Sequence, residues 1–118
     1  MRNPCLLVVD DDPKITRMLS IALARGGYEI RASHSGEEAL DEVRRERPDA
    51  VLLDLCMPDM SGEAVLEFLK TDQDLCHVPV IITTGKTDAP ELAEAYAVIT
   101  KPFNLRRLYR TIDRALGG

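Results

Sequence analysis

The chain of 118 residues is long enough for one hydrophobic core and too short for two, so we expect a single domain over residues 1–118. Its 45% hydrophobic and 30% charged residues exclude a disordered or fibrous chain, and no apolar run approaches the roughly 20 residues of a membrane span. The formal net charge of −5 and the lack of a signal-peptide pattern predict a cytoplasmic protein without direct contact to nucleic acid or membrane.

The first strand and helix patterns occupy residues 5–25. Residues 5–9 form a continuous apolar run, which is typical of a strand covered on both faces. Asp12 can cap the helix that follows, and Gly26 can end it. The expected apolar face of this helix consists of Ile15, Met18, Leu19, Ala22 and Leu23.

The next two units repeat this order. Residues 28–32 form a weaker strand pattern, which suggests a sheet edge, and residues 35–47 form a helix pattern that opens with Ser35 and Glu38 at capping-box spacing. Residues 50–54 predict a third strand, and residues 62–69 predict a third helix. Strand and helix therefore alternate through the first half of the chain.

The last two units complete the pattern. Residues 78–84 and 97–100 predict the fourth and fifth strands, with a short helical stretch over residues 89–96 between them. The final helix is expected over residues 104–116, with an apolar face of Leu105, Leu108, Tyr109, Ile112 and Leu116. The alternation predicts an α/β fold with a doubly wound, five-stranded parallel sheet and helices on both faces.

Polar residues stand where four of these strands end. Asp10 and Asp11 follow the first strand, Asp54 ends the third, Thr84 ends the fourth and Lys101 follows the fifth. Carboxylates packed together repel one another unless a cation is present, and oxygen ligands favour Mg²⁺. Each residue could instead serve only as a cap or an ion-pair partner, but all of them together are better explained by acyl-phosphate chemistry with Asp54 as nucleophile.

Four separated motifs carry a family resemblance over essentially the full length of the chain. They are LLVVDDDP, VLLDLCMPDMSG, VPVIITTG and ITKPF. In this order and spacing they resemble the receiver domain of a two-component response regulator. The resemblance implies a flavodoxin-like, CheY-like fold with strand order 2-1-3-4-5.

The resemblance also implies roles for individual residues. Asp54 would be the phosphoacceptor, receiving the group from a sensor histidine kinase or a histidine phosphotransfer protein. Asp10, Asp11, Asp54 and the backbone carbonyl of Cys56 would bind Mg²⁺. Thr84 and Lys101 would contact the phosphoryl group, and the bond between Lys101 and Pro102 is expected to be cis. Such a domain is no conventional enzyme; it would act on a downstream protein or a fused effector domain, with a homodimer as a further possibility.

The sequence departs from the family pattern around the fourth helix. Lys101 lies only 17 positions after Thr84, so we expect that helix to be short or irregular. Val98 replaces the aromatic switch residue usual in the family, unless Tyr96 substitutes for it. These changes suggest an altered output surface. Cys56 and Lys86, at positions that tune hydrolysis in relatives, suggest a long-lived or intermediate-lived phosphorylated state.

Other functions are weaker alternatives. A phosphatase of the haloacid dehalogenase type needs a second acid two residues after the nucleophile, where this chain has Cys56. A nucleotide binder would not place three aspartates after the first strand, because they would repel phosphate. Cys76 and His77 are at most half of a metal site. The main alternative is a pseudo-receiver, a protein-interaction module that keeps the fold without phosphorylation switching.

Overall fold

The fold is a parallel sheet flanked by helices, as the alternating pattern predicts. The computed structural model describes residues 3–85, 94–102 and 104–117. The strands are β1 (Cys5–Val9), β2 (Glu29–Ser33), β3 (Ala50–Asp54), β4 (Val80–Thr84) and β5 (Ala97–Thr100). The helices are α1 (Pro13–Arg25), α2 (Gly36–Arg45), α3 (Gly62–Thr71) and α4 (Leu105–Ala115).

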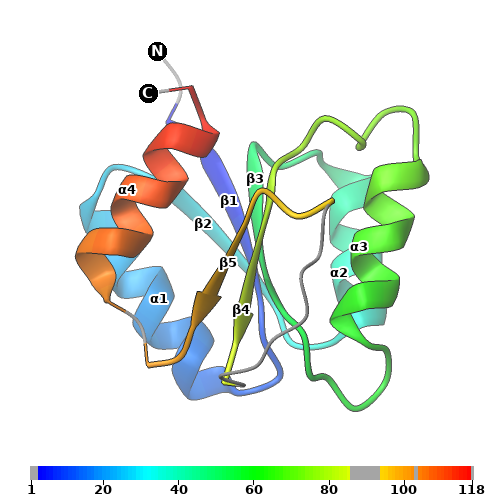
Figure 1. Cartoon of the computed structure of the whole chain (residues 1–118), viewed down its shortest axis with the longest axis horizontal. Coiled ribbons are helices and arrows are strands. Elements are labelled where there is room, and N and C mark those ends of the chain that lie inside the picture. The colour runs from blue at the N-terminus through cyan, green and yellow to red at the C-terminus, as the bar shows by residue number, and fades with distance from the viewer. Residues whose placement is uncertain (1–2, 86–93, 103, 118) are drawn as a thin grey trace.

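The strand order is β2-β1-β3-β4-β5 and every neighbouring pair is parallel, which confirms the expected topology. α1 and α4 cover one face of the sheet, while α2 and α3 cover the other (Figure 1). From β1 the chain first adds β2 on one side and then crosses to add β3 on the other side. The strand order therefore reverses between β1 and β3, and the carboxyl ends of these two strands flank this switch point. Ligands of open α/β sheets bind at this kind of position.

The core consists of two apolar layers, one on each face of the sheet. Leu7 and Val9 of β1 pack toward α2 and α3, while Leu6 and Val8 pack toward α1 and α4. All five residues of β1, β3 and β4 are buried, which explains their continuous apolar runs. β2 is mostly half-buried and lies at the sheet edge, as its weaker pattern predicts.

The helices begin at capping residues that the sequence supplies. The side chain of Asp12 accepts a hydrogen bond from the Lys14 backbone, and that of Ser35 accepts one from the Glu38 backbone. α3 extends to Thr71, two residues beyond the predicted end. β4 begins at Val80 instead of residue 78, because Val78 closes a turn by donating its backbone N–H to Leu75.

Two predictions about buried helix faces are wrong. Met18 and Leu105, expected on the core faces of their helices, expose 44% and 39% of their surface. Thr16 is buried instead of Met18, because its hydroxyl is satisfied by the Pro13 carbonyl at 3.1 Å. The predicted short helix over residues 89–96, and with it the expected irregularity of the fourth helix, falls largely outside the described residues.

Among the described residues, no helix combines the length and the apolar character that a membrane crossing requires.

Candidate functional site

The carboxylates at the strand ends converge on one point. Asp10 follows β1, Asp54 ends β3, and Asp11 lies beside Asp10 in the turn that leads to α1. Their side-chain oxygens lie within 4.8 Å of one another. Asp10 and Asp54 are 2% and 4% exposed, whereas Asp11 is open to solvent. The site therefore has a buried acidic floor and one acidic residue at its mouth.

The backbone around β1 fixes the position of Asp10. Its N–H donates to the Ser33 carbonyl at 3.1 Å, and its carboxylate accepts the Asp12 N–H at 2.9 Å. The same turn starts α1, which Asp12 caps. The geometry of one short turn thus places Asp10 inward and sends the chain away into the helix.

Lys101 supplies the positive charge of the site. Its Nζ lies 2.7 Å from Asp10 Oδ2 and 3.5 Å from Asp54 Oδ1. Its backbone N–H donates to the Thr84 carbonyl at 2.7 Å, so β4 holds the lysine against the acids. The peptide bond between Lys101 and Pro102 is cis, as expected. One ammonium faces three carboxylates, and the cluster keeps an excess of negative charge.

The electrostatics make Asp54 a poorly stabilised anion. Burial raises the pKa of its carboxyl, the charge of Asp10 raises it further, and Lys101 opposes the rise. The pKa of Lys101 is also raised, because the hydrogen bond and charge of Asp10 and the charge of Asp54 outweigh the effect of burial. Since Lys101 sits closer to Asp10, Asp54 is the less neutralised of the two buried acids. A carboxylate of raised pKa is a better nucleophile.

The raised pKa has a consequence for stability. A carboxyl whose pKa rises on folding contributes stability below its ordinary pKa, and this contribution is lost as pH rises through the folded value. Ionised Asp54 therefore costs stability at neutral pH. We expect Asp54→Asn to raise the melting temperature by about 4 °C at pH 7 in EDTA, with a gain that shrinks toward acid pH. A variant that melts below the wild type at pH 7 would contradict this electrostatic account.

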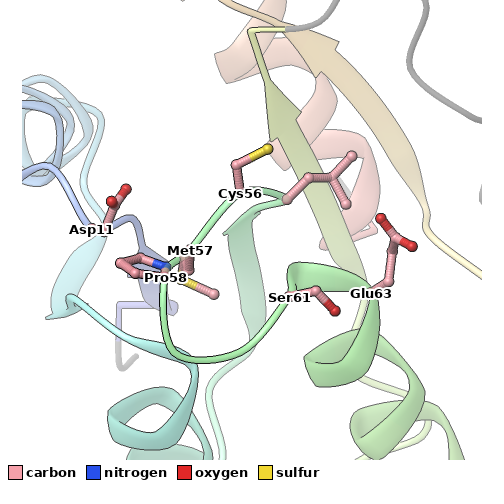
Figure 2. A pocket seen from close by; sticks show the side chains of 7 residues that line it. Asp11, Cys56, Met57, Pro58, Ser61 and Glu63 are labelled. Atoms are coloured by element: carbon pink, nitrogen blue, oxygen red, sulfur yellow. The ribbon is translucent and has the colours of Figure 1, made fainter.

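An open pocket of about 560 Å³ lies beside Asp11, at the mouth of the acidic cluster. Asp11 lies on one side, Cys56 and Pro58 of the loop after β3 form a wall, and Glu63 of α3 stands opposite (Figure 2). Cys56 is exposed, and it lines the same pocket as Asp11. The structure thus brings together Asp10, Asp11, Asp54 and Lys101, with Thr84 joined to Lys101 and Cys56 at the pocket wall.

Gly62 is a sterically constrained position next to the site, to which the sequence analysis assigned no role. Its N–H donates to the Leu55 carbonyl at 2.9 Å, and a Cβ built on it would lie 2.4 Å from the Asp54 carbonyl oxygen. Only glycine lets α3 begin this close to the end of β3. The signal available in the sequence was a glycine at the start of a helix pattern.

We expect Gly62→Ala to lower the free energy of unfolding by about 2 kcal/mol, because the methyl group must displace the backbone of Asp54. Gly85→Ala is the matched control: it borders the same site, but its Cβ would meet no atom of the described residues within 4 Å, so its effect should stay within about 0.5 kcal/mol. Urea unfolding followed by circular dichroism measures both changes. Equal midpoints for the two variants would show that Gly62 is not sterically required.

The structure also bears on the remaining sequence expectations. Val98 is half-buried against the core layer of α2 and α3, while Tyr96 is 47% exposed. Lys86, which together with Cys56 led us to predict a phosphorylated state of long or intermediate lifetime, lies outside the described residues. Within the described part of the chain, the three aspartates form the one group of three metal-ligating side chains, and Cys76 and His77 belong to none.

Comparisons with known proteins point to one family. The profile of the response regulator receiver domain matches residues 6–113. The DNA-binding response regulator MtrA of Mycolicibacterium smegmatis is 39% identical over 116 residues, which cover 94% of this chain and 50% of MtrA. The polar-differentiation response regulator DivK of Brucella ovis is 34% identical over 117 residues, 95% of each chain.

A solved structure shows the same fold. The chemotaxis response regulator CheY4 of Vibrio cholerae superposes with a TM-score of 0.88 at 29% identity, covering 97% of this chain and 99% of CheY4. The chain spans about half the length of MtrA and nearly the full length of DivK and CheY4.

Proposed function

The chain belongs to the response regulator receiver domain family of two-component signalling, and we propose that it accepts a phosphoryl group on Asp54. Receiver domains are signalling modules and not conventional enzymes. The observation that carries the proposal is the position of Lys101, within 3.5 Å of two buried carboxylates at the switch in strand order. A purely structural ion pair would need one acid, not three.

The donor set of the site fits Mg²⁺. The clustered oxygens of Asp10, Asp11 and Asp54 are hard ligands with an excess of negative charge, and the open pocket beside Asp11 has room for the waters that Mg²⁺ retains. We propose that these three residues and the backbone carbonyl of Cys56 hold the ion. When bound, it would offset the negative charge of the phosphoryl group.

In the proposed reaction a carboxylate oxygen of Asp54 attacks phosphorus and forms an acyl phosphate. With a phosphohistidine donor, the bond from phosphorus to nitrogen breaks, its electron pair returns to the ring nitrogen, and the imidazole takes up a proton from solvent. Lys101 is placed to stabilise the charge of the transferred group, and the Thr84 hydroxyl is proposed to donate a hydrogen bond to it. The raised pKa of Asp54 supports its role as nucleophile.

The donor partner in this proposal is a sensor histidine kinase or a histidine phosphotransfer protein. The output would reach a downstream protein by docking, or a fused effector as in relatives of greater length, and a homodimer is a further prediction. MtrA is described as DNA-binding, and this chain corresponds to half of it. The boundaries of the domain and its cytoplasmic location stay predictions.

Intact-mass spectrometry tests the proposed function. The protein is incubated with acetyl phosphate, a small donor from which acetate leaves, in Mg²⁺ or in EDTA. We expect a single phosphoryl adduct that forms in Mg²⁺ and not in EDTA. The absence of any adduct, with acetyl phosphate and with phosphorylated kinases alike, would assign the chain to the pseudo-receivers.

A further inference from the structure

The loop of residues 55–61 between β3 and α3, called here the β3–α3 loop, forms a wall of the pocket beside the acidic cluster. Under the proposed function, on which this inference rests, the loop also supplies a ligand of the ion through the Cys56 carbonyl. A loop ligand contributes more to a metal site when the loop is already held in place, because binding then does not have to order the loop.

The base of the loop is held by its own ends. Gly62 donates its N–H to the Leu55 carbonyl at 2.9 Å, and its close approach to the Asp54 carbonyl leaves no room for a side chain. These contacts close the loop but do not fix the direction in which its tip projects. Cys56 and Pro58 lie between this base and the tip.

The tip is held by Asp59. Its two carboxylate oxygens each accept a backbone hydrogen bond at 3.1 Å, one from Gly36 and one from Glu37, at the first turn of α2. The neighbouring Met60 lies against Gly36 so closely that a Cβ at Gly36 would come within 2.7 Å of the Met60 Cβ. A segment 23 positions away in the sequence thus fixes the loop.

The first turn of α2 has two separate acceptors. The Ser35 hydroxyl caps the helix from within by accepting the Glu38 N–H at 3.0 Å, while Asp59 accepts the two preceding N–H groups from outside. Asp59 is exposed, and its hydrogen bonds to Glu37 and Gly36 hold the pKa of its carboxyl below the usual range. Capping of α2 and anchoring of the loop can therefore be separated by mutation.

We propose that Asp59 is a positioning residue of the metal site, which ties the β3–α3 loop to the N-terminus of α2 and so holds Cys56 beside Asp10, Asp11 and Asp54. Among the described residues, Asp59 neither lines the pocket nor belongs to the acidic cluster. Its effect on the ion is transmitted to Cys56 through the backbone of the two intervening residues, Met57 and Pro58. Loss of such a supporting partner typically weakens metal binding by about 10-fold or more.

The test measures Mg²⁺ binding by titration calorimetry without any phosphodonor. We expect Asp59→Ala to raise the dissociation constant for Mg²⁺ about 10-fold. Ser35→Ala is the matched control, because it removes a cap from the same helix turn and leaves the loop contacts in place. Both variants should melt at lower temperature, but only the Asp59 variant should bind Mg²⁺ more weakly. Asp59→Asn keeps one acceptor oxygen and should give a smaller loss of affinity.

The outcomes separate this inference from the proposed function. Wild-type affinity in the folded Asp59 variants, together with a lowered melting temperature, would show that Asp59 only caps α2 and would overturn the inference alone. Equal losses of affinity in the Ser35 and Asp59 variants would overturn it as well. A wild-type protein that binds no Mg²⁺ would remove both the inference and the metal-dependent function.

Discussion

Asp54→Asn is expected to abolish the Mg²⁺-dependent phosphoryl adduct. The carboxamide is close in size to the carboxylate but is a far weaker nucleophile, so no acyl phosphate can form at position 54. Unfolding is not the expected cause of this loss, because removal of the buried charge is expected to stabilise the fold. Intact-mass spectra of both proteins, recorded after the same incubation with acetyl phosphate, measure the effect.

The matched control for this experiment is Asp41→Asn. Asp41 is an exposed carboxylate on α2, with 75% of its side chain accessible, and it lies outside the acidic cluster. It should leave the adduct at the wild-type level. A full adduct in the Asp54 variant would mean that another group accepts the phosphoryl, and the assignment of the nucleophile would be wrong.

Lys101→Ala is expected to have the second largest effect. It leaves the buried carboxylates of Asp10 and Asp54 without their counter-charge, which costs about 2–3 kcal/mol of unfolding free energy for a pair that is partly open to solvent. Phosphorylation should slow about 100-fold, as in other sites that lose one charge-stabilising donor. Urea unfolding in EDTA and the time course of the adduct measure these two effects.

The pH dependence and a control variant sharpen this prediction. The pKa of Lys101 is raised by Asp10 and Asp54, so its stabilising effect is present at neutral pH and is lost as pH rises above the ordinary lysine pKa. The difference in unfolding free energy between wild type and the Lys101 variant should therefore disappear in strong alkali. Arg107→Ala, an exposed cation on α4, should change neither stability nor rate. If the Lys101 variant were as stable as the wild type in EDTA, Lys101 would not be the counter-charge that stabilises the buried carboxylates of Asp10 and Asp54.

Most of the fold could be predicted because each strand carries its own signal. The apolar runs that end at Val9, Asp54 and Thr84 are fully buried strands, and parallel pairing brings their carboxyl ends to one edge. The acids and the lysine could then be placed together from their positions in the strands alone. Their charges supplied the reason to expect an ion.

Periodicity could not predict which apolar side chains the sheet would cover. Met18 and Leu105 follow the helical period but lie at the rim between α1 and α4, where they line an apolar hollow together with Ile15 and Pro102. Thr16 is polar and yet buried, because a local carbonyl satisfies its hydroxyl. Burial at the rim of a sheet depends on tertiary packing, and the residue type alone does not determine it.

The support of the site also could not be predicted from local patterns. Asp59 stands in the quoted motif after Asp54, but its partners Gly36 and Glu37 lie in another unit of the fold. Gly62 has an unremarkable place at the start of a helix until its distance from Asp54 is known. Contacts of this kind depend on how the loops meet once the sheet has formed.

The central claim is that Asp54 becomes an acyl phosphate, and chemical trapping tests it most directly. Borohydride reduces an acyl phosphate to an alcohol, so phosphorylated Asp54 would become homoserine, which peptide mass spectrometry can locate. We predict homoserine at position 54 after treatment with acetyl phosphate and Mg²⁺, and none after treatment in EDTA. Homoserine at Asp10 or Asp11, or a phosphoryl adduct that borohydride does not reduce, would contradict the account.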